Sequence, residues 1–361
     1  MLRANLVLIL LATSGVATQR TSSSAVPKSK LYVLNSLADD MTVIDVETDQ
    51  IVRTVKVGKE PHGIASPAAQ DVLYVSNEGE DSLTVVDTAT DEVKAKYTGL
   101  GKRPNEIEVT PDGRYVYVSV VADGKYEVFD TVKKSIVARL DTDGMPHNVV
   151  GSPDGRWMYL SPNDRRERTV EYMRKQGMPT SLNKKIYVVD TRTHSIVGTV
   201  PLPNAPRPTA ISPDGRRLYV NVDGLLGFVV VDTEQRRVIS EAQYQLSEAE
   251  RRVETRSHGI GVTPDGKEVW SLDRGNGLAH IFDVRRLPPR QVGRVAVGKA
   301  PYWLTFTPDG KTIYVSNSQE DTISVIDVRK RAEKTRIFVG KGKRPIRSLV
   351  VAPPDRRAAS R

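Results

Sequence analysis

Three histidines at equivalent places of a repeated pattern are the residues in this sequence with the clearest chemical potential. His62, His147 and His258 each lie 12 residues before an aromatic residue within a short apolar run. Imidazole binds transition metals such as copper and zinc, accepts protons near neutral pH, and binds anions when it is protonated. The pattern therefore predicts either a metal site formed by these three histidines or a site for a small ligand.

Other chemically useful residues share this position or follow it directly. Asn105, Arg207 and Tyr302 occupy the same place in other copies of the pattern, and Glu106 and Trp303 come one residue later. Arginine suits a carboxylate, and the aromatic pair offers an apolar wall with polar tips. The predicted ligand-binding set is His62, Asn105, His147, Arg207, His258, Tyr302 and Trp303. For an enzyme, the candidate catalytic set is His147, His258, Arg207 and Glu106, with a histidine as the general base.

Simpler interpretations of these residues remain open. A histidine at such a turn can hydrogen-bond loop carbonyls, and Pro-His-Gly can be the local consensus for entering a strand. The 361 residues include no cysteine, which excludes disulfides, thiolate metal sites and cysteine nucleophiles. We find no nucleophile elbow, phosphate loop or metal motif of diagnostic spacing.

A repeat of about 42 residues predicts the elements that position these side chains. The run Leu31-Tyr32-Val33 recurs six times in related forms, and in six of the seven copies an Asp follows the aromatic residue by 13 positions. Five copies are preceded by Pro-Asp-Gly, which favours a tight turn between strands. Each repeat contains four short runs rich in Val, Ile and Tyr, as expected for four β-strands.

Seven units of four strands predict an all-β fold, a seven-bladed β-propeller with antiparallel strands. The chain enters the repeat at a second strand, near Leu31, and leaves it with a first strand, Ile346 to Val351. We therefore expect the N- and C-terminal strands to pair and close the ring, which removes free strand edges. The histidine position then lies at the start of the innermost strand, beside the central channel, at the end of the ring that we call the top.

The repeats also resemble a known family. The segments LYVLNSLADDMTVIDVETDQIVRTVKVG, LYVSNEGEDSLTVVDTATDEV and IYVSNSQEDTISVIDVRKR are similar to the YVTN-type β-propeller repeat. The resemblance implies secreted, periplasmic or cell-surface propellers, often without known activity. It indicates the fold more firmly than the function.

Two insertions interrupt the period, and loop topology assigns both to the face that also holds the histidines. The first, within residues 161–185, is rich in basic residues: Arg165, Arg166, Arg168, Arg174, Lys175, Lys184 and Lys185. Such a segment can attract an anionic ligand or surface, but we favour a solvated loop. The second lies near residues 241–257.

The termini predict the compartment and the domain limits. Residues 1–17 have the basic start, apolar centre and small-residue end of a signal peptide, although a buried first strand or an uncleaved anchor is an alternative. We expect a flexible lead-in at 18–29, the propeller at 30–353 and a basic tail at 354–361. The predicted location is the periplasm, the exterior or the cell surface, with no transmembrane segment.

Two functional hypotheses follow from these residues. We favour an exported binding or scaffold propeller, a monomer that presents a small-molecule or protein site on its top face and binds no nucleic acid. The alternative is a propeller enzyme or a metal-dependent redox accessory, lactonase-like or lyase-like, or with copper or zinc at the channel mouth. The net charge of +9 does not separate them.

Overall fold

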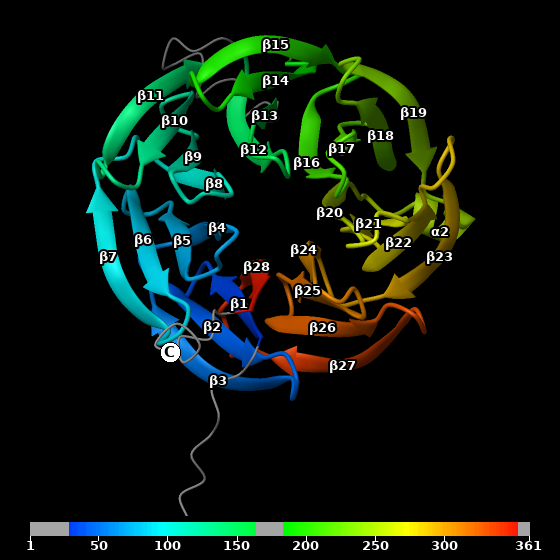
Figure 1. Cartoon of the computed structure of the whole chain (residues 1–361). Coiled ribbons are helices and arrows are strands. Elements are labelled where there is room, and N and C mark those ends of the chain that lie inside the picture. Colours follow the sequence, from blue (N-terminus) through cyan, green and yellow to red (C-terminus); the bar gives the residue numbers. More distant parts are fainter. Residues whose placement is uncertain (1–28, 164–182, 353–361) are drawn as a thin grey trace, which may run out of the picture.

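The protein forms a closed ring of seven four-stranded antiparallel sheets around a central channel (Figure 1). The computed structural model describes residues 29–163 and 183–352. The prediction of a seven-bladed β-propeller is confirmed.

Each blade contributes one strand to each of four concentric layers. The innermost strands are β28 (Pro345–Val351), β4 (Pro61–Ala65), β8 (Pro104–Val109), β12 (Met145–Gly151), β16 (Pro206–Ile211), β20 (Ser257–Val262) and β24 (Pro301–Phe306). The second strands are β1 (Lys30–Asn35), β5 (Val72–Asn77), β9 (Tyr115–Val120), β13 (Trp157–Asn163), β17 (Arg217–Val222), β21 (Glu268–Asp273) and β25 (Thr312–Asn317). The third strands are β2 (Asp40–Asp45), β6 (Ser82–Asp87), β10 (Lys125–Asp130), β14 (Lys185–Asp190), β18 (Gly227–Asp232), β22 (Leu278–Asp283) and β26 (Thr322–Asp327). The outer strands are β3 (Gln50–Lys56), β7 (Glu92–Thr98), β11 (Ser135–Asp141), β15 (Ser195–Pro201), β19 (Arg237–Gln243), β23 (Arg290–Ala296) and β27 (Ala332–Phe338).

The two ends of the described chain close the ring as the sequence predicts. The blade that we number 1 has the strand order β28-β1-β2-β3, so its innermost strand comes from the C-terminal end. The register places Lys30 opposite Val351 and Tyr32 opposite Leu349. Blades 2 to 7 begin with β4, β8, β12, β16, β20 and β24.

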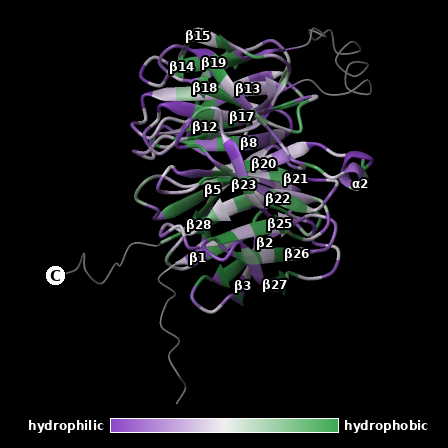
Figure 2. Cartoon of the chain, turned by 90° about the vertical axis from the view of Figure 1, so that its right-hand side faces the viewer, coloured by the Kyte–Doolittle hydropathy of each residue, from purple (hydrophilic) through white to green (hydrophobic). Residues whose placement is uncertain are grey.

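The core consists of seven apolar clusters, most of which combine residues of two neighbouring blades. In one of them, Tyr32 and Met41 of blade 1 pack with Leu73 and Val75 of blade 2. Burying a side chain of this size contributes about 1.5–3 kcal/mol, so each blade is stabilised mainly by its neighbours. The side view shows hydrophobic colour concentrated on strands and hydrophilic colour on the loops of the rim (Figure 2).

The recurring tyrosine of the second strand also links neighbouring blades. Tyr32 donates its hydroxyl to Asp91 of the next blade at 2.6 Å, and the Nζ of Lys30 lies 2.8 Å from the same carboxylate. Tyr314 donates to Asp49 across the closure at 2.8 Å. In these two repeats the aromatic position therefore supplies both a buried ring and a hydrogen bond between blades.

The turns at one end of the ring are regular, and we call this end the bottom face. In the turn that begins at Thr110, the hydroxyl donates to Asp112 at 2.5 Å, and the amide of Gly113 donates to the Thr110 carbonyl at 2.8 Å. Gly113 has φ of +74°, a left-handed conformation that explains the glycine of the Pro-Asp-Gly motif.

The opposite end, which we call the top face, holds the loops between second and third strands and the loops between blades. The second insertion includes the short helix α2 (Glu248–Arg251), whose capping box joins Ser247 and Glu250. The Glu250 carboxylate pairs with Arg294 of the outer strand at 2.8 Å. Arg165, Arg166, Arg168, Arg174 and Lys175 of the first insertion lie outside the described residues.

Candidate functional site

A cavity of about 320 Å³ lies at the top mouth of the central channel. Four of its lining residues belong to the predicted ligand set: His62, Asn105, His147 and Tyr302. They start the innermost strands of four different blades, and Ile346 of a fifth lines the same cavity. The equivalence of repeat positions therefore does bring these side chains around one space.

The backbone of the mouth is held by neighbouring blades. Ser76 donates its hydroxyl to the Asn105 carbonyl, and Ser316 donates to the Ile346 carbonyl at 2.6 Å. The amide of His147 donates to the Tyr126 hydroxyl at 3.0 Å. Each of these bonds joins two blades, so the mouth is a preformed part of the ring, as ligand sites usually are.

Tyr302 connects two of the three predicted histidines. The Nε2 of His62 lies 3.4 Å from the Tyr302 hydroxyl, and the two ring centroids are 6.3 Å apart. The His258 ring lies closer, with a centroid separation of 4.2 Å, and its Nδ1 donates to the Tyr302 carbonyl at 2.8 Å. The aromatic wall predicted from the sequence is thus provided by Tyr302.

His258 is electrostatically unlike a typical catalytic histidine. Burial, helped by the positive charges of Arg274, Arg256 and Arg207, lowers its pKa to about 3. The imidazole is therefore neutral at physiological pH. A general base works best with a pKa near the operating pH, so His258 is poorly matched to that predicted role.

Arg207 is positioned by a carboxylate of its own blade. Its Nε and Nη2 donate to the two carboxylate oxygens of Asp223 at 2.5 and 2.9 Å. Such a bidentate pair neutralises much of the positive charge of Arg207, which we expected to bind a ligand carboxylate. Arg207 does not line the mouth cavity.

Glu106 and Trp303 both contact Arg347, one residue further along their innermost strands than the mouth residues. The Nε of Arg347 donates to Glu106 at 2.9 Å, and the Arg347 guanidinium carbon lies 3.3 Å from the Trp303 ring centroid. Glu106 belongs to blade 3 and Arg347 to blade 1, so the pair passes the innermost strand of blade 2. A side chain at Gly63 of that strand would approach the Asn105 carbonyl to 2.5 Å, which explains the glycine there. Neither Glu106 nor Trp303 lines the mouth cavity.

The predicted metal triad is not assembled. His62 and His147 line the cavity, whereas His258 is turned toward Tyr302. Among residues 29–163 and 183–352, no three His, Asp or Glu side chains are grouped so that they could hold a metal ion.

A membrane-spanning helix, which would need a long apolar stretch, is not found in the same part of the chain.

Sequence reasoning missed several arginines at this site. Arg347 directly follows Ile346, at the same repeat position as Glu106 and Trp303, so aligning the last repeat one residue further would have found it. Arg103 and Arg344 line the mouth cavity, and Arg274 approaches Tyr302 from the top loop of blade 6. Arg103 and Arg344 each directly precede the proline that starts an innermost strand, so aligning the repeats one residue earlier would have found them, and Arg274 directly follows a second strand.

A second polar cluster, around His280 in blade 6, is buried and structural. Asp273 and His280 occupy the positions that Asn77 and Thr84 hold in blade 2, where the asparagine donates to the threonine at 2.8 Å. The His280 Nε2 lies 3.7 Å from the Asp273 carboxylate, and both side chains are fully buried.

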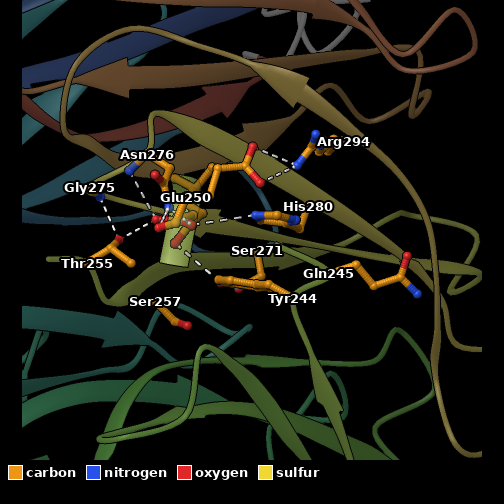
Figure 3. Close-up of polar contacts among 12 residues, drawn as sticks. Tyr244, Gln245, Glu250, Thr255, Ser257, Ser271, Gly275, Asn276, His280 and Arg294 are labelled. Atoms are coloured by element: carbon orange, nitrogen blue, oxygen red, sulfur yellow. Dashed lines mark hydrogen bonds and ion pairs between the residues drawn. The ribbon is translucent and has the colours of Figure 1, made fainter. Parts of the chain in front are cut away.

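Residues of the second insertion hold this cluster in place (Figure 3). The Tyr244 ring stacks on His280 at 4.0 Å, and its hydroxyl lies 2.6 Å from the Ser271 hydroxyl. Thr255 donates to Asp273. Because no reactant can reach these groups, the cluster anchors the insertion to blade 6.

Two family models match separate parts of the chain. Residues 5–138 match a YNCE-like β-propeller, and residues 229–338 match the family described as lactonase, 7-bladed β-propeller. Each match covers less than half of the chain. Together they agree with the seven-bladed ring, and neither one names the YVTN repeat.

Solved structures share the fold across nearly the whole chain. The periplasmic gluconolactonase of Pseudomonas aeruginosa is 19% identical, with a TM-score of 0.71 over 90% of this chain and 100% of that one. Hydrazine synthase of Kuenenia stuttgartiensis is 20% identical, with a TM-score of 0.69 over 87% of this chain and 99% of that one. A putative 6-phosphogluconolactonase of Bacteroides fragilis is 16% identical, with a TM-score of 0.70 over 91% and 99%. At these identities the likeness shows the fold alone.

One curated protein is similar over a shorter stretch. Antigen Lp49 of Leptospira interrogans is 30% identical over 106 residues, which are 29% of this chain and 22% of that protein. The chain thus matches about a fifth of the length of this relative.

Proposed function

We propose that this protein is an exported binding propeller that holds a small hydrophilic ligand at the top mouth of its central channel. One observation carries the proposal: the cavity of about 320 Å³ in which His62, Asn105, His147 and Tyr302 converge from four blades. A concave, preformed site with a few convergent polar groups is the usual form of a small-molecule site. Export rests on the signal-like sequence of residues 1–17.

The polar lining favours a hydroxylated or charged ligand over an apolar one. His62, Asn105 and His147 offer donors and acceptors, while Tyr302 provides one aromatic face. Such a face suits a sugar-like ring whose edges are polar.

The test is a thermal-shift screen of sugars, sugar acids and lactones, followed by calorimetric titration of each ligand that raises the melting temperature. We expect His147→Ala to abolish the shift. The matched control is His194→Ala on the bottom face, which removes a bond to Tyr117 but leaves the mouth intact. A shift that survives His147→Ala, His62→Ala and their combination would place the ligand elsewhere.

A lactonase activity is the second candidate, because the lactonase family model matches residues 229–338. In that reaction, water attacks the lactone carbonyl, the ring C–O bond breaks, and a hydroxy acid forms with release of a proton. His62 and His147 are candidate bases in the cavity, which Glu60 and Glu78 also line. The assay follows proton release from glucono-δ-lactone. Hydrolysis that is no faster than the spontaneous rate rejects this activity. So does hydrolysis that is unchanged in the His147→Ala variant.

Metal analysis of protein purified without a histidine tag separates both candidates from a metalloenzyme. The separation of His258 from the cavity leads us to expect less than one copper or zinc per chain. A stoichiometric metal that is lost in the combined His62, His147 and His258 to Ala variant would contradict this expectation.

A further inference from the structure

Arg274 is a cation beside the mouth that pairs with no carboxylate among the described residues. It follows β21 in the top loop of blade 6 and is largely buried, and its guanidinium carbon lies 5.0 Å from the Tyr302 ring centroid. Within residues 29–163 and 183–352, its side chain forms no ion pair or hydrogen bond with another residue. Removing a guanidinium from water without a partner costs free energy, so Arg274 at this position destabilises the ligand-free protein.

Like charges surround Arg274 and raise that cost. Burial together with the charges of Arg256 and Arg344 lowers the pKa of Arg274. Burial and the charges of Arg274, Arg256 and Arg207 lower the pKa of the neighbouring His258. The mouth on this side therefore has a positive potential.

Three carboxylates near the mouth pair with other arginines. Glu78 pairs with Arg103 at 2.6 Å, and Asp223 pairs with Arg207. Glu320, near Arg274, pairs with Arg336 at 3.0 Å. Asp321 accepts the backbone amide of Arg344 at 2.8 Å, and the Arg344 guanidinium forms no ion pair with a described residue.

Arg274 lines one hollow, and Tyr302, which it contacts, lines another. One, of about 720 Å³, is lined by Arg256, Arg274 and Lys299. The other is the mouth cavity, lined by Tyr302 and Arg344. Because Arg274 lies against Tyr302, a ligand on the aromatic ring is within reach of cations from both hollows.

We propose that the ligand of this site is a small organic anion, and that Arg274, with Arg344, binds its carboxylate or phosphate group while Tyr302 covers its body. This inference rests on the proposed function and names the class of ligand. Guanidinium groups match the oxygens of both anions, which explains why two arginines are kept close together despite their repulsion.

The test uses three probes that share one ring and differ only at C6: D-glucose, D-glucuronate and D-glucose 6-phosphate. Calorimetric titration at low and at physiological salt measures the affinity of each. We expect one or both anions to bind, with an affinity that falls as salt rises, and glucose to bind at least tenfold more weakly. The two anionic probes distinguish a carboxylate ligand from a phosphate ligand.

Two variants test the residue itself. We expect Arg274→Gln to weaken anion binding about ten- to a hundredfold, since a charged hydrogen bond is lost. The control is Arg329→Gln, which lines a different hollow and should bind like the natural protein. The ligand-free Arg274→Gln variant should melt no lower than the natural protein, whereas loss of a merely structural arginine would lower its melting temperature.

The outcomes separate this inference from the proposed function. Anions that bind no better than glucose, or equally well to Arg274→Gln, overturn the anion site. If a neutral compound binds and is lost in His147→Ala, the mouth is still a ligand site and only the anionic class is wrong. If nothing in the wider screen binds, both proposals fail.

Discussion

Glu108 should make the stability of this propeller fall as the pH rises from about 4.5 to about 7. It lies on the innermost strand β8, where its carboxylate accepts the amide of Val109 at 3.0 Å and a second amide from Gly151. No cation among the described residues pairs with it. Burial raises its pKa from 4.5 to about 7.

The sign and size of the effect follow from linkage between protonation and folding. The folded state holds the Glu108 proton more tightly than the unfolded state, so folding stability decreases from pH 4.5 to about 7 and then levels off. One pKa unit corresponds to about 1.4 kcal/mol, which makes the largest loss about 3 kcal/mol. The side chain is partly exposed to the channel, so we treat this value as an upper limit.

The perturbation is Glu108→Gln, which keeps the shape and the acceptor oxygen but removes the charge. We expect the variant and the natural protein to have similar urea midpoints at pH 5. At pH 8 the variant should be more stable, by about 1–3 kcal/mol, because only the natural protein then buries a carboxylate. The control is Glu92→Gln on the exposed outer strand β7, which should change neither midpoint.

A constant difference between Glu108→Gln and the natural protein from pH 5 to pH 8 would refute this reasoning. So would a natural protein that is the more stable of the two at pH 8, since Glu108 would then have a favourable partner in its charged form. Monitoring unfolding by both fluorescence and circular dichroism checks that a single transition is compared.

Three further predictions concern how the ring is held together. Asp91→Asn leaves the buried Lys30 ammonium without its counter-charge and should cost about 3–5 kcal/mol in urea unfolding, and an unchanged midpoint would mean that water reaches this pair. Gly113→Ala places a side chain where φ is +74°, and we expect a loss of about 1–2 kcal/mol by the same measurement unless the turn changes its conformation. Tyr244→Ala removes the ring stacked on His280, so amide exchange should accelerate in residues 244–256, and equal acceleration throughout the ring would instead indicate global destabilisation.

Much of the scaffold could be predicted from the sequence because its determinants are local and repeated seven times. The Tyr32 position, the Pro-Asp-Gly turns and the Asp that ends each third strand recur at nearly constant spacing, and each occupies the same place in its blade. The placement of His62, Asn105, His147 and Tyr302 around one cavity followed from this equivalence.

The ion pairs and protonation of the other candidate residues could not be predicted, because they depend on interaction partners that sequence spacing does not reveal. Arg207 meets a carboxylate 16 residues away, and Glu106 meets an arginine 241 residues away, on the far side of the closure. His258 occupies the same repeat position as His62 and His147, yet its burial and the arginines around it lower its pKa.

The amino-acid sequence alone thus establishes the strands, the turns, the number of blades and the end of the ring at which the mouth residues lie. It can do so because the alternation of apolar and polar residues and the chemistry of turns act over a few residues. Only the tertiary structure decides which of those residues face a cavity, which are neutralised by ion pairs, and which charge remains exposed to a ligand. The physical reason is that electrostatic partners are chosen by distance in space, and in a closed ring the nearest partner often lies in another blade. The opposite states of Arg207, which is paired, and Arg274, which is not, arise in this way.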